Sequence, residues 1–128
     1  DLSRINLNDS KDTIINKIKK AKTDDNILPG DNKNLSDRPE VQNLLGIYSS
    51  LSDQKLELTI NEFSGKNFFE FKTKLSELVV EKISPISTEI NRLLKDKEFI
   101  DKILFEGSQK ANKIASKKVN EIKKKVGF

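Results

Sequence analysis

The chain has 128 residues, of which 34% are hydrophobic and 34% are charged, and its formal net charge is +4. This length suits one modest core. The absence of cysteine and histidine excludes disulfides, thiolate and histidine metal sites, and the Ser-His-Asp and Cys-His catalytic arrangements. No apolar run approaches the roughly 18 residues that a membrane span needs, and no signal-peptide pattern opens the chain. We therefore expect a soluble protein that does not span a membrane and does not catalyse a reaction by itself.

The first 38 residues are predicted to hold one amphipathic helix between two irregular segments. Residues 1–8 have no helical period and are expected to form a loop. Asp9 is the expected N-cap, with Asp12 three positions later as in a capping box. The lysines of "KIKKAK" are interpreted as a solvated face near the helix C-terminus. Residues 24–38 combine a Pro-Gly pair with clustered Asp and Asn, which predicts a loop. The apolar residues that share one face of this helix are Ile14, Ile15, Ile18 and Ala21.

The middle of the chain predicts three further helical stretches. Pro39 suits the first turn of a helix, and Ser52 is the expected cap of a short helix that ends at Phe63. A longer stripe begins at Phe68, and Pro85 is expected to kink or end that helix near Ser84 because proline lacks a backbone N–H. The apolar residues of the first of these stretches are Val41, Leu44, Leu45, Tyr48 and Leu51. Tyr48 is expected in the core with its hydroxyl near the surface.

The aromatic side chains divide into core candidates and one expected exception. Phe71, Phe99 and Phe105 lie at core spacing. Phe68 and Phe69 are adjacent, so both cannot face the same core, and we expect one of them to be exposed or buried at a second interface.

The C-terminal third is predicted to contain a junction at "KDKEF" and a last helix that begins near Gly107 or Ser108 and ends at Gly127. One face of that helix is apolar: Ala111, Ile114, Ala115, Val119, Ile122 and Val126. No strand-like alternation occurs in the sequence. The expected fold is therefore all-α, a compact bundle of about five or six amphipathic helices forming a single domain over residues 1–128, with the helical region at 9–128.

The positive charge is concentrated at the C-terminal end. Residues 1–40 contain eight basic and eight acidic side chains, whereas residues 108–128 contain seven lysines and one glutamate. Lys110, Lys113, Lys117 and Lys124 form a stripe on the last helix, apart from its apolar face. Such a stripe suits a polyanionic partner. The alternative interpretation is a solvated face that only keeps the bundle soluble.

Four segments, in this order, resemble the C-terminal part of bacterial-type tryptophanyl-tRNA synthetases. They are "TIINKIKKAKTD" at Thr13–Asp24, "NLLGIYSSLSDQ" at Asn43–Gln54, "FKTKLSELVVEKISPI" at Phe71–Ile86 and "ILFEGSQKANKIA" at Ile103–Ala115. The chain also ends on Val-Gly-Phe, similar to the Gly-hydrophobic end of that family. Each motif is weakly specific, but the four extend over nearly the whole chain.

The resemblance implies a helical anticodon-binding domain that follows the Lys-Met-Ser-Lys-Ser loop of a class I synthetase. The implied partners are the anticodon region of tRNA(Trp) and a Rossmann catalytic domain, in a cytoplasmic parent enzyme that is a homodimer and uses ATP and magnesium. Neither the His-x-Gly-His signature nor the Lys-Met-Ser-Lys-Ser loop occurs in this sequence. The chain is therefore expected to be a fragment without catalytic, cofactor-binding or metal-binding residues of its own.

If the resemblance holds, the basic stripe supplies the contacts to tRNA. Lysines hold phosphates, and amide side chains read base edges in single-stranded loops. The tRNA-binding candidates are Lys110, Lys113, Lys117, Lys124, Gln109, Asn112 and Asn120. An alternative function is a freestanding helical protein-interaction module whose apolar faces dock another polypeptide.

Overall fold

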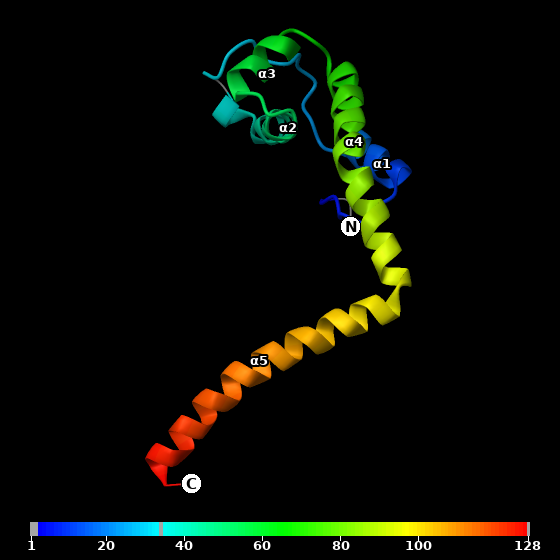
Figure 1. Cartoon of the computed structure of the whole chain (residues 1–128). Helices are drawn as coiled ribbons and strands as arrows, with labels where there is room; N and C mark the ends of the chain where they lie inside the picture. Colours follow the sequence, from blue (N-terminus) through cyan, green and yellow to red (C-terminus); the bar gives the residue numbers. More distant parts are fainter. Residues whose placement is uncertain (1–2, 34, 128) are drawn as a thin grey trace. The chain divides into compact units, whose positions relative to one another are not determined.

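The computed structural model describes residues 3–33 and 35–127 and is built from helices (Figure 1). The elements are α1 (Lys11–Lys20), a 3-10 turn η1 (Leu35–Asp37), α2 (Pro39–Leu51), α3 (Leu56–Phe63), α4 (Phe68–Lys95) and α5 (Lys97–Val126). No strand occurs within the described residues, so the all-α prediction is confirmed. The chain divides into two compact units, Asp1–Thr88 and Glu89–Phe128. The single-domain organisation stays a prediction.

Helix α1 begins one residue later than its sequence pattern suggests. The N-cap is Ser10, whose hydroxyl accepts a hydrogen bond from the Thr13 N–H at 3.2 Å. The expectation of an Asp9 cap is wrong because the Asp9 carboxylate has other donors. It accepts from the Asn6 N–H at 2.9 Å and from the Lys17 ammonium at 2.6 Å. The ion pair therefore ties the segment before α1 to the second turn of the helix.

The Asp9–Lys17 pair predicts a specific loss of stability in acid. The Lys17 ammonium and the Asn6 N–H hold the pKa of Asp9 below its ordinary value of 3.8. A carboxyl whose pKa is lower in the folded state stabilises the fold above its unfolded pKa, and this contribution is lost as the pH falls through the folded pKa. Asp9→Asn should therefore lower the urea midpoint at neutral pH and flatten its decline below about pH 4.

Urea titrations followed by circular dichroism at neutral and acidic pH would measure this effect. Asp12→Asn is the matched control, because Asp12 lies in the first turn of the same helix and forms no ion pair among the described residues. An unchanged acid dependence in Asp9→Asn would show that another group carries it.

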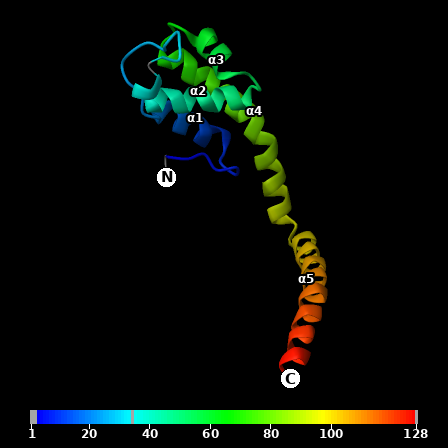
Figure 2. The same ribbon diagram turned by 90° about the vertical axis from the view of Figure 1, so that its left-hand side faces the viewer.

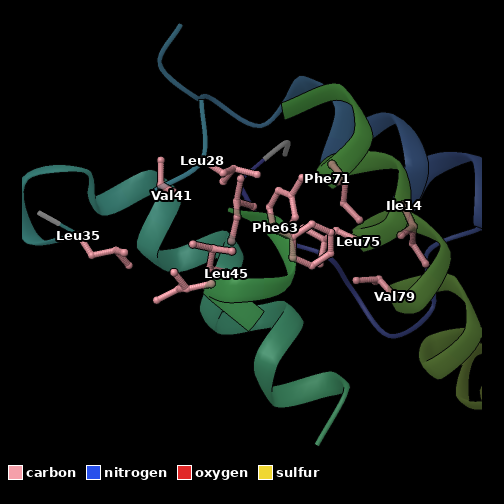
Figure 3. Packing of buried hydrophobic residues seen from close by; sticks show 12 residues of the cluster. Ile14, Leu28, Leu35, Val41, Leu45, Phe63, Phe71, Leu75 and Val79 are labelled. Atoms are coloured by element: carbon pink, nitrogen blue, oxygen red, sulfur yellow. The ribbon is translucent and has the colours of Figure 1, made fainter. Parts of the chain in front are cut away.

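The core of the first unit lies among α1, α2, α3 and α4 (Figure 3). An aromatic cluster occupies its centre. The ring centroid of Phe63 lies 4.8 Å from that of Tyr48 and 4.8 Å from that of Phe71, and both contacts are edge to face. The Tyr48 hydroxyl donates to Glu62 at 3.5 Å, and burial raises the pKa of Tyr48. The position predicted for Tyr48 is therefore confirmed. The buried hydrophobic residues are Ile14, Ile18, Leu28, Leu35, Val41, Leu44, Leu45, Ile60, Phe63, Phe71, Leu75 and Val79.

Helix α2 starts at Pro39, as predicted, but Ser52 does not begin the next helix. Ser52 is the C-cap of α2, and its hydroxyl donates to the Tyr48 carbonyl at 2.8 Å. The chain then turns through Asp53, which has a φ of 57°, and Lys55 is the N-cap of α3. A left-handed residue at this point reverses the chain, so the short helix starts later than the sequence suggests.

The loop between α1 and α2 is fastened at two points. The Arg38 guanidinium donates to both carboxylate oxygens of Asp24, at 2.7 and 2.8 Å, and to the Ile27 carbonyl at 3.0 Å. The Arg38 pairing holds the pKa of Asp24 below its usual value. Leu28 is buried, and its backbone pairs with Gly65 and Lys66 in the turn before α4. Within its described residues, 24–33 and 35–38, the predicted loop is thus confirmed, apart from the 3-10 turn η1. Residue 34 lies outside the described residues.

Pro85 is expected from the sequence to kink the helix or to end it near Ser84. Helix α4 continues through Pro85 to Lys95, so the proline does not end it. The proline removes one backbone donor, but the turns on both sides are held by other contacts. Val79 is buried in the core before it. After it, the Ser87 hydroxyl donates to the Leu7 carbonyl in the segment before α1. These contacts stabilise the helix on either side of the proline.

The second unit consists of the end of α4 and the 30-residue helix α5. The junction predicted at "KDKEF" is confirmed, since Asp96 caps α5 by accepting from the Phe99 N–H at 3.1 Å. The predicted helix start near Gly107 or Ser108 is wrong, because α5 runs unbroken through both residues. An interior glycine costs only about 1 kcal/mol relative to alanine. Gly127 ends α5 with a φ of 88°, as expected.

The residues of α5 are not buried. Phe99 and Phe105, which the spacing placed in a core, are 45% and 64% exposed. Their helix has no other long element of its own unit to pack against (Figure 2). Within the described ranges, no helix is both long and apolar enough to cross a lipid bilayer.

Candidate nucleic-acid interface

All seven tRNA-binding candidates lie on α5, and the unbroken helix determines which of them share a face. With about 100° of rotation and 1.5 Å of rise per residue, the four stripe lysines lie within an arc of about 60° along about 21 Å of helix. Asn120 and Gln109 lie at the edge of that arc. Asn112 lies further round the helix. We call Lys110, Lys113, Lys117 and Lys124 the basic stripe.

Part of the basic stripe borders a shallow hollow of about 450 Å³ on the surface of α5. The structure therefore brings four of the seven candidates together and leaves Lys117, Asn120 and Lys124 outside the hollow. Ser116 lines it as well and was missed by the sequence analysis. Its position three residues after Lys113 is the signal that would have found it. The residues that line the hollow are Gln109, Lys110, Asn112, Lys113 and Ser116.

The basic stripe carries uncompensated charge. The one acidic residue in this part of α5, Glu121, pairs with Lys118, which lies outside the stripe, at 3.1 Å. In the described part of the chain, no carboxylate lies within ion-pair distance of the four stripe lysines. Adjacent positions three or four residues apart are about 5–6 Å from each other on a helix. Lys110, Lys113 and Lys117 therefore form one continuous positive strip, and Lys124 lies about two turns further along the same face of α5.

A second group of lysines has a local structural role. Lys123, Lys124 and Lys125 occupy the last turn of α5, where the negative end of the helix dipole favours cations. Lys124 thus has a structural explanation as well as a place in the stripe. Lys110, Lys113 and Lys117 lie several turns earlier, so the dipole does not account for them.

The face of α5 away from the basic stripe is apolar and exposed. Ile114 is 71% exposed, and Ile122 and Val126 are 59% and 62% exposed.

Across residues 3–33 and 35–127, histidine, cysteine and acidic side chains do not gather in groups of three that could hold a metal ion.

Comparison with known proteins identifies relatives along the whole chain. No family model matches it. It is 48% identical over 128 residues to the tryptophan–tRNA ligase of Agrobacterium fabrum and 46% identical over 128 residues to that of Rhizobium meliloti. It is also 46% identical over 129 residues to the tryptophan–tRNA ligase of Rickettsia typhi. All of this chain is covered in each comparison, but it spans only 36–38% of the length of these relatives.

Proposed function

We propose that this chain forms the helical tRNA-binding part of a tryptophan–tRNA ligase. All of its residues align with tryptophan–tRNA ligases, and the aligned part is about a third of their length. The parent enzyme would attach tryptophan to tRNA(Trp) in protein synthesis. The chain would supply the surface that receives the anticodon region. The observation that carries this proposal is the basic stripe, whose lysines lie on one face of α5 without neighbouring carboxylates.

The roles of the residues follow from their chemistry. Ammonium groups of Lys110, Lys113 and Lys117 hold phosphates of the RNA backbone, which positions the loop without reading its sequence. Gln109 and Asn112 share a hollow with two of these lysines. Their amides donate and accept hydrogen bonds, so they suit the Watson–Crick edge of an unstacked base. Lys124 and Asn120 extend the same contact toward the C-terminus.

The chemistry of aminoacylation belongs, in this proposal, to parts of the parent enzyme outside these 128 residues. The present chain has no histidine, and its described acidic residues form no group suited to a metal ion. In this proposal, ATP and magnesium are bound by the Rossmann catalytic domain, which is the second partner of this chain. The parent enzyme would be a cytoplasmic homodimer.

Binding of tRNA at varied salt concentration tests the proposal. Each lysine that neutralises a phosphate adds about 0.7–0.9 to the slope of log affinity against log salt. We expect the 128-residue chain to bind tRNA(Trp), and a Lys110/Lys113/Lys117→Ala variant to show a slope shallower by about 2. Filter binding with labelled tRNA between about 0.05 and 0.3 M KCl covers the range in which the salt-dependent phosphate contacts dominate the affinity.

The matched control is a Lys118/Lys123/Lys125→Ala variant. It also removes three positive charges from α5, but at positions outside the basic stripe. The slope of log affinity against log salt should stay close to that of the unmodified chain. Equal losses in the two variants would mean that net charge, not the stripe, attracts the RNA. An unchanged slope in the stripe variant would exclude these lysines as contacts.

A second candidate function is a helical protein-interaction module. The exposed apolar face of α5, with Ile114, Ile122 and Val126, favours it. This function predicts that the chain self-associates or binds a protein and binds tRNA no more tightly than an unrelated polyanion such as heparin. Competition of the two polyanions in the same filter assay separates the two functions.

A further inference from the structure

An aromatic ring lies exposed on the first unit, far in sequence from the basic stripe. Phe69, in the first turn of α4, is 77% exposed, whereas its neighbour Phe68 packs against the core. The prediction that one of the two is exposed is therefore confirmed. A phenylalanine this exposed gains little from burial, so its ring is available to a partner.

Phe69 forms one wall of a groove between α1 and α4, which we call the α1–α4 groove. The groove has a volume of about 330 Å³. Two of its apolar lining residues, Ile15 and Val80, are half-buried, and we use the word rim for its exposed polar residues Lys19, Thr73 and Glu77. The residues that line it are Ile15, Lys19, Phe69, Thr73, Ser76, Glu77 and Val80.

Hydrogen bonds of Lys72 join α4 to the end of α1, the two helices that line the groove. The Lys72 ammonium on α4 donates to the Ala21 carbonyl at 2.6 Å and to the Thr23 hydroxyl at 3.2 Å, just after the end of α1. On α4 itself, the Thr73 hydroxyl donates to the Phe69 carbonyl at 2.8 Å. The Lys72 hydrogen bonds hold the end of α1 against α4, and fixed positions of these two helices lower the ordering cost of binding a ligand between them.

The charges around the groove are unequally compensated. On and beside α1, Lys17 pairs with Asp9 at 2.6 Å and Lys22 pairs with Glu40 at 3.3 Å. In the part of the chain that the structure describes, Lys19 has no carboxylate at ion-pair distance, and Glu77 has no cation at that distance. The rim therefore presents one available cation and one available carboxylate beside an exposed aromatic ring.

We propose that the α1–α4 groove binds one base of single-stranded RNA, a deepening that rests on the proposed tRNA-binding function. The base stacks on Phe69, an adjacent phosphate contacts Lys19, and the Glu77 carboxylate accepts a hydrogen bond from an exocyclic amino group. Stacking on aromatic side chains is how proteins hold unstacked bases in RNA loops. A carboxylate suits the amino group of cytosine, which uracil lacks.

We assign RNA as the occupant because the groove combines an aromatic ring for a base, a cation for a phosphate and a carboxylate for an amino group. An amphipathic protein helix would require a continuous apolar lining, whereas this groove has a lysine, a threonine and a glutamate at its rim. A free anion would not use the aromatic wall.

A single tryptophan makes the contact measurable. The chain contains no tryptophan, so F69W introduces one reporter that still stacks a base. We expect short oligocytidylate to quench its fluorescence. L58W is the matched control, because Leu58 is also exposed, at 57%, but lies on α3 and does not line the groove. Its emission should not change.

Two further variants separate stacking from base selection in filter binding of the oligonucleotides. Phe69→Leu keeps an apolar side chain but removes the ring and should weaken oligocytidylate binding about tenfold. Glu77→Ala should remove a preference of oligocytidylate over oligouridylate and leave oligouridylate binding unchanged. Both substitutions are at exposed positions, so circular dichroism should show unchanged helix content.

The outcomes distinguish this inference from the proposed function. Quenching in F69W together with an unchanged salt slope in the Lys110/Lys113/Lys117→Ala variant would support the groove and reject the basic stripe. Lack of quenching at an RNA concentration that saturates filter binding would overturn the groove while the stripe stands. A change in F69W emission with protein concentration alone would also overturn it, because the groove would then bind a second copy of the chain. If the unmodified chain binds no RNA, both proposals fail.

Discussion

Phe63→Ala is expected to lower the free energy of unfolding of the first unit by about 3–5 kcal/mol, the range observed when a buried aromatic ring is removed from a core. The Phe63 side chain is fully buried and contacts Tyr48 and Phe71 edge to face at 4.8 Å. Removal of the ring loses its apolar burial and both ring contacts, and it leaves a cavity between α2, α3 and α4.

Tyr48 provides a local probe for this measurement. It is the only tyrosine, and the chain has no tryptophan, so intrinsic fluorescence in urea reports on the first unit. Circular dichroism reports on all helices, including α5. Phe69→Ala is the matched control, because it removes the same side chain from a position that is 77% exposed; it should change stability by less than about 0.5 kcal/mol. Similar urea midpoints for the two variants would mean that the aromatic cluster is not the centre of the core.

Lys72→Met is expected to destabilise the first unit by about 2 kcal/mol, in the range for hydrogen bonds that involve a charged group. Burial lowers the pKa of Lys72, because the partly desolvated ammonium is less favourable than one in water. Its hydrogen bonds to the Ala21 carbonyl and the Thr23 hydroxyl offset this cost. Methionine keeps much of the aliphatic stem and removes the donors, so the residues just after α1 lose their link to α4.

Lys74→Met is the control for Lys72→Met. Lys74 is also on α4, but its side chain is 52% exposed and its nearest carboxylate, on Glu62, is 3.7 Å away, so it should contribute less than about 1 kcal/mol. Urea unfolding followed by Tyr48 fluorescence measures both variants. If Lys72→Met is no less stable than Lys74→Met, the link between α1 and α4 is carried by side-chain packing alone.

The helical class, most of the core and the helix ends that depend on local chemistry could be predicted from the order of residues alone. Apolar spacing of three and four residues placed Ile14, Val41 and Phe71 in the core correctly, because that period leaves one face of a helix for burial. Pro39 and Gly127 marked a helix start and a helix end, because their backbone preferences are local. The basic stripe was also evident from composition and helical period, although its role in binding stays a prediction.

Features that depend on contacts between separate segments could not be predicted in this way and required the folded structure. Asp9 pairs with Lys17, so Ser10 caps α1 instead. Contacts of Val79 and Ser87 on either side of Pro85 maintain α4 through the proline. Phe99 has the spacing of a core residue but is exposed. The spacing predicts which helix face is apolar, but it does not predict whether another element packs against that face. The α1–α4 groove likewise depends on residues of α1 and α4 that lie about 50 to 65 positions apart in the chain, and local periodicity contains no information about such pairs.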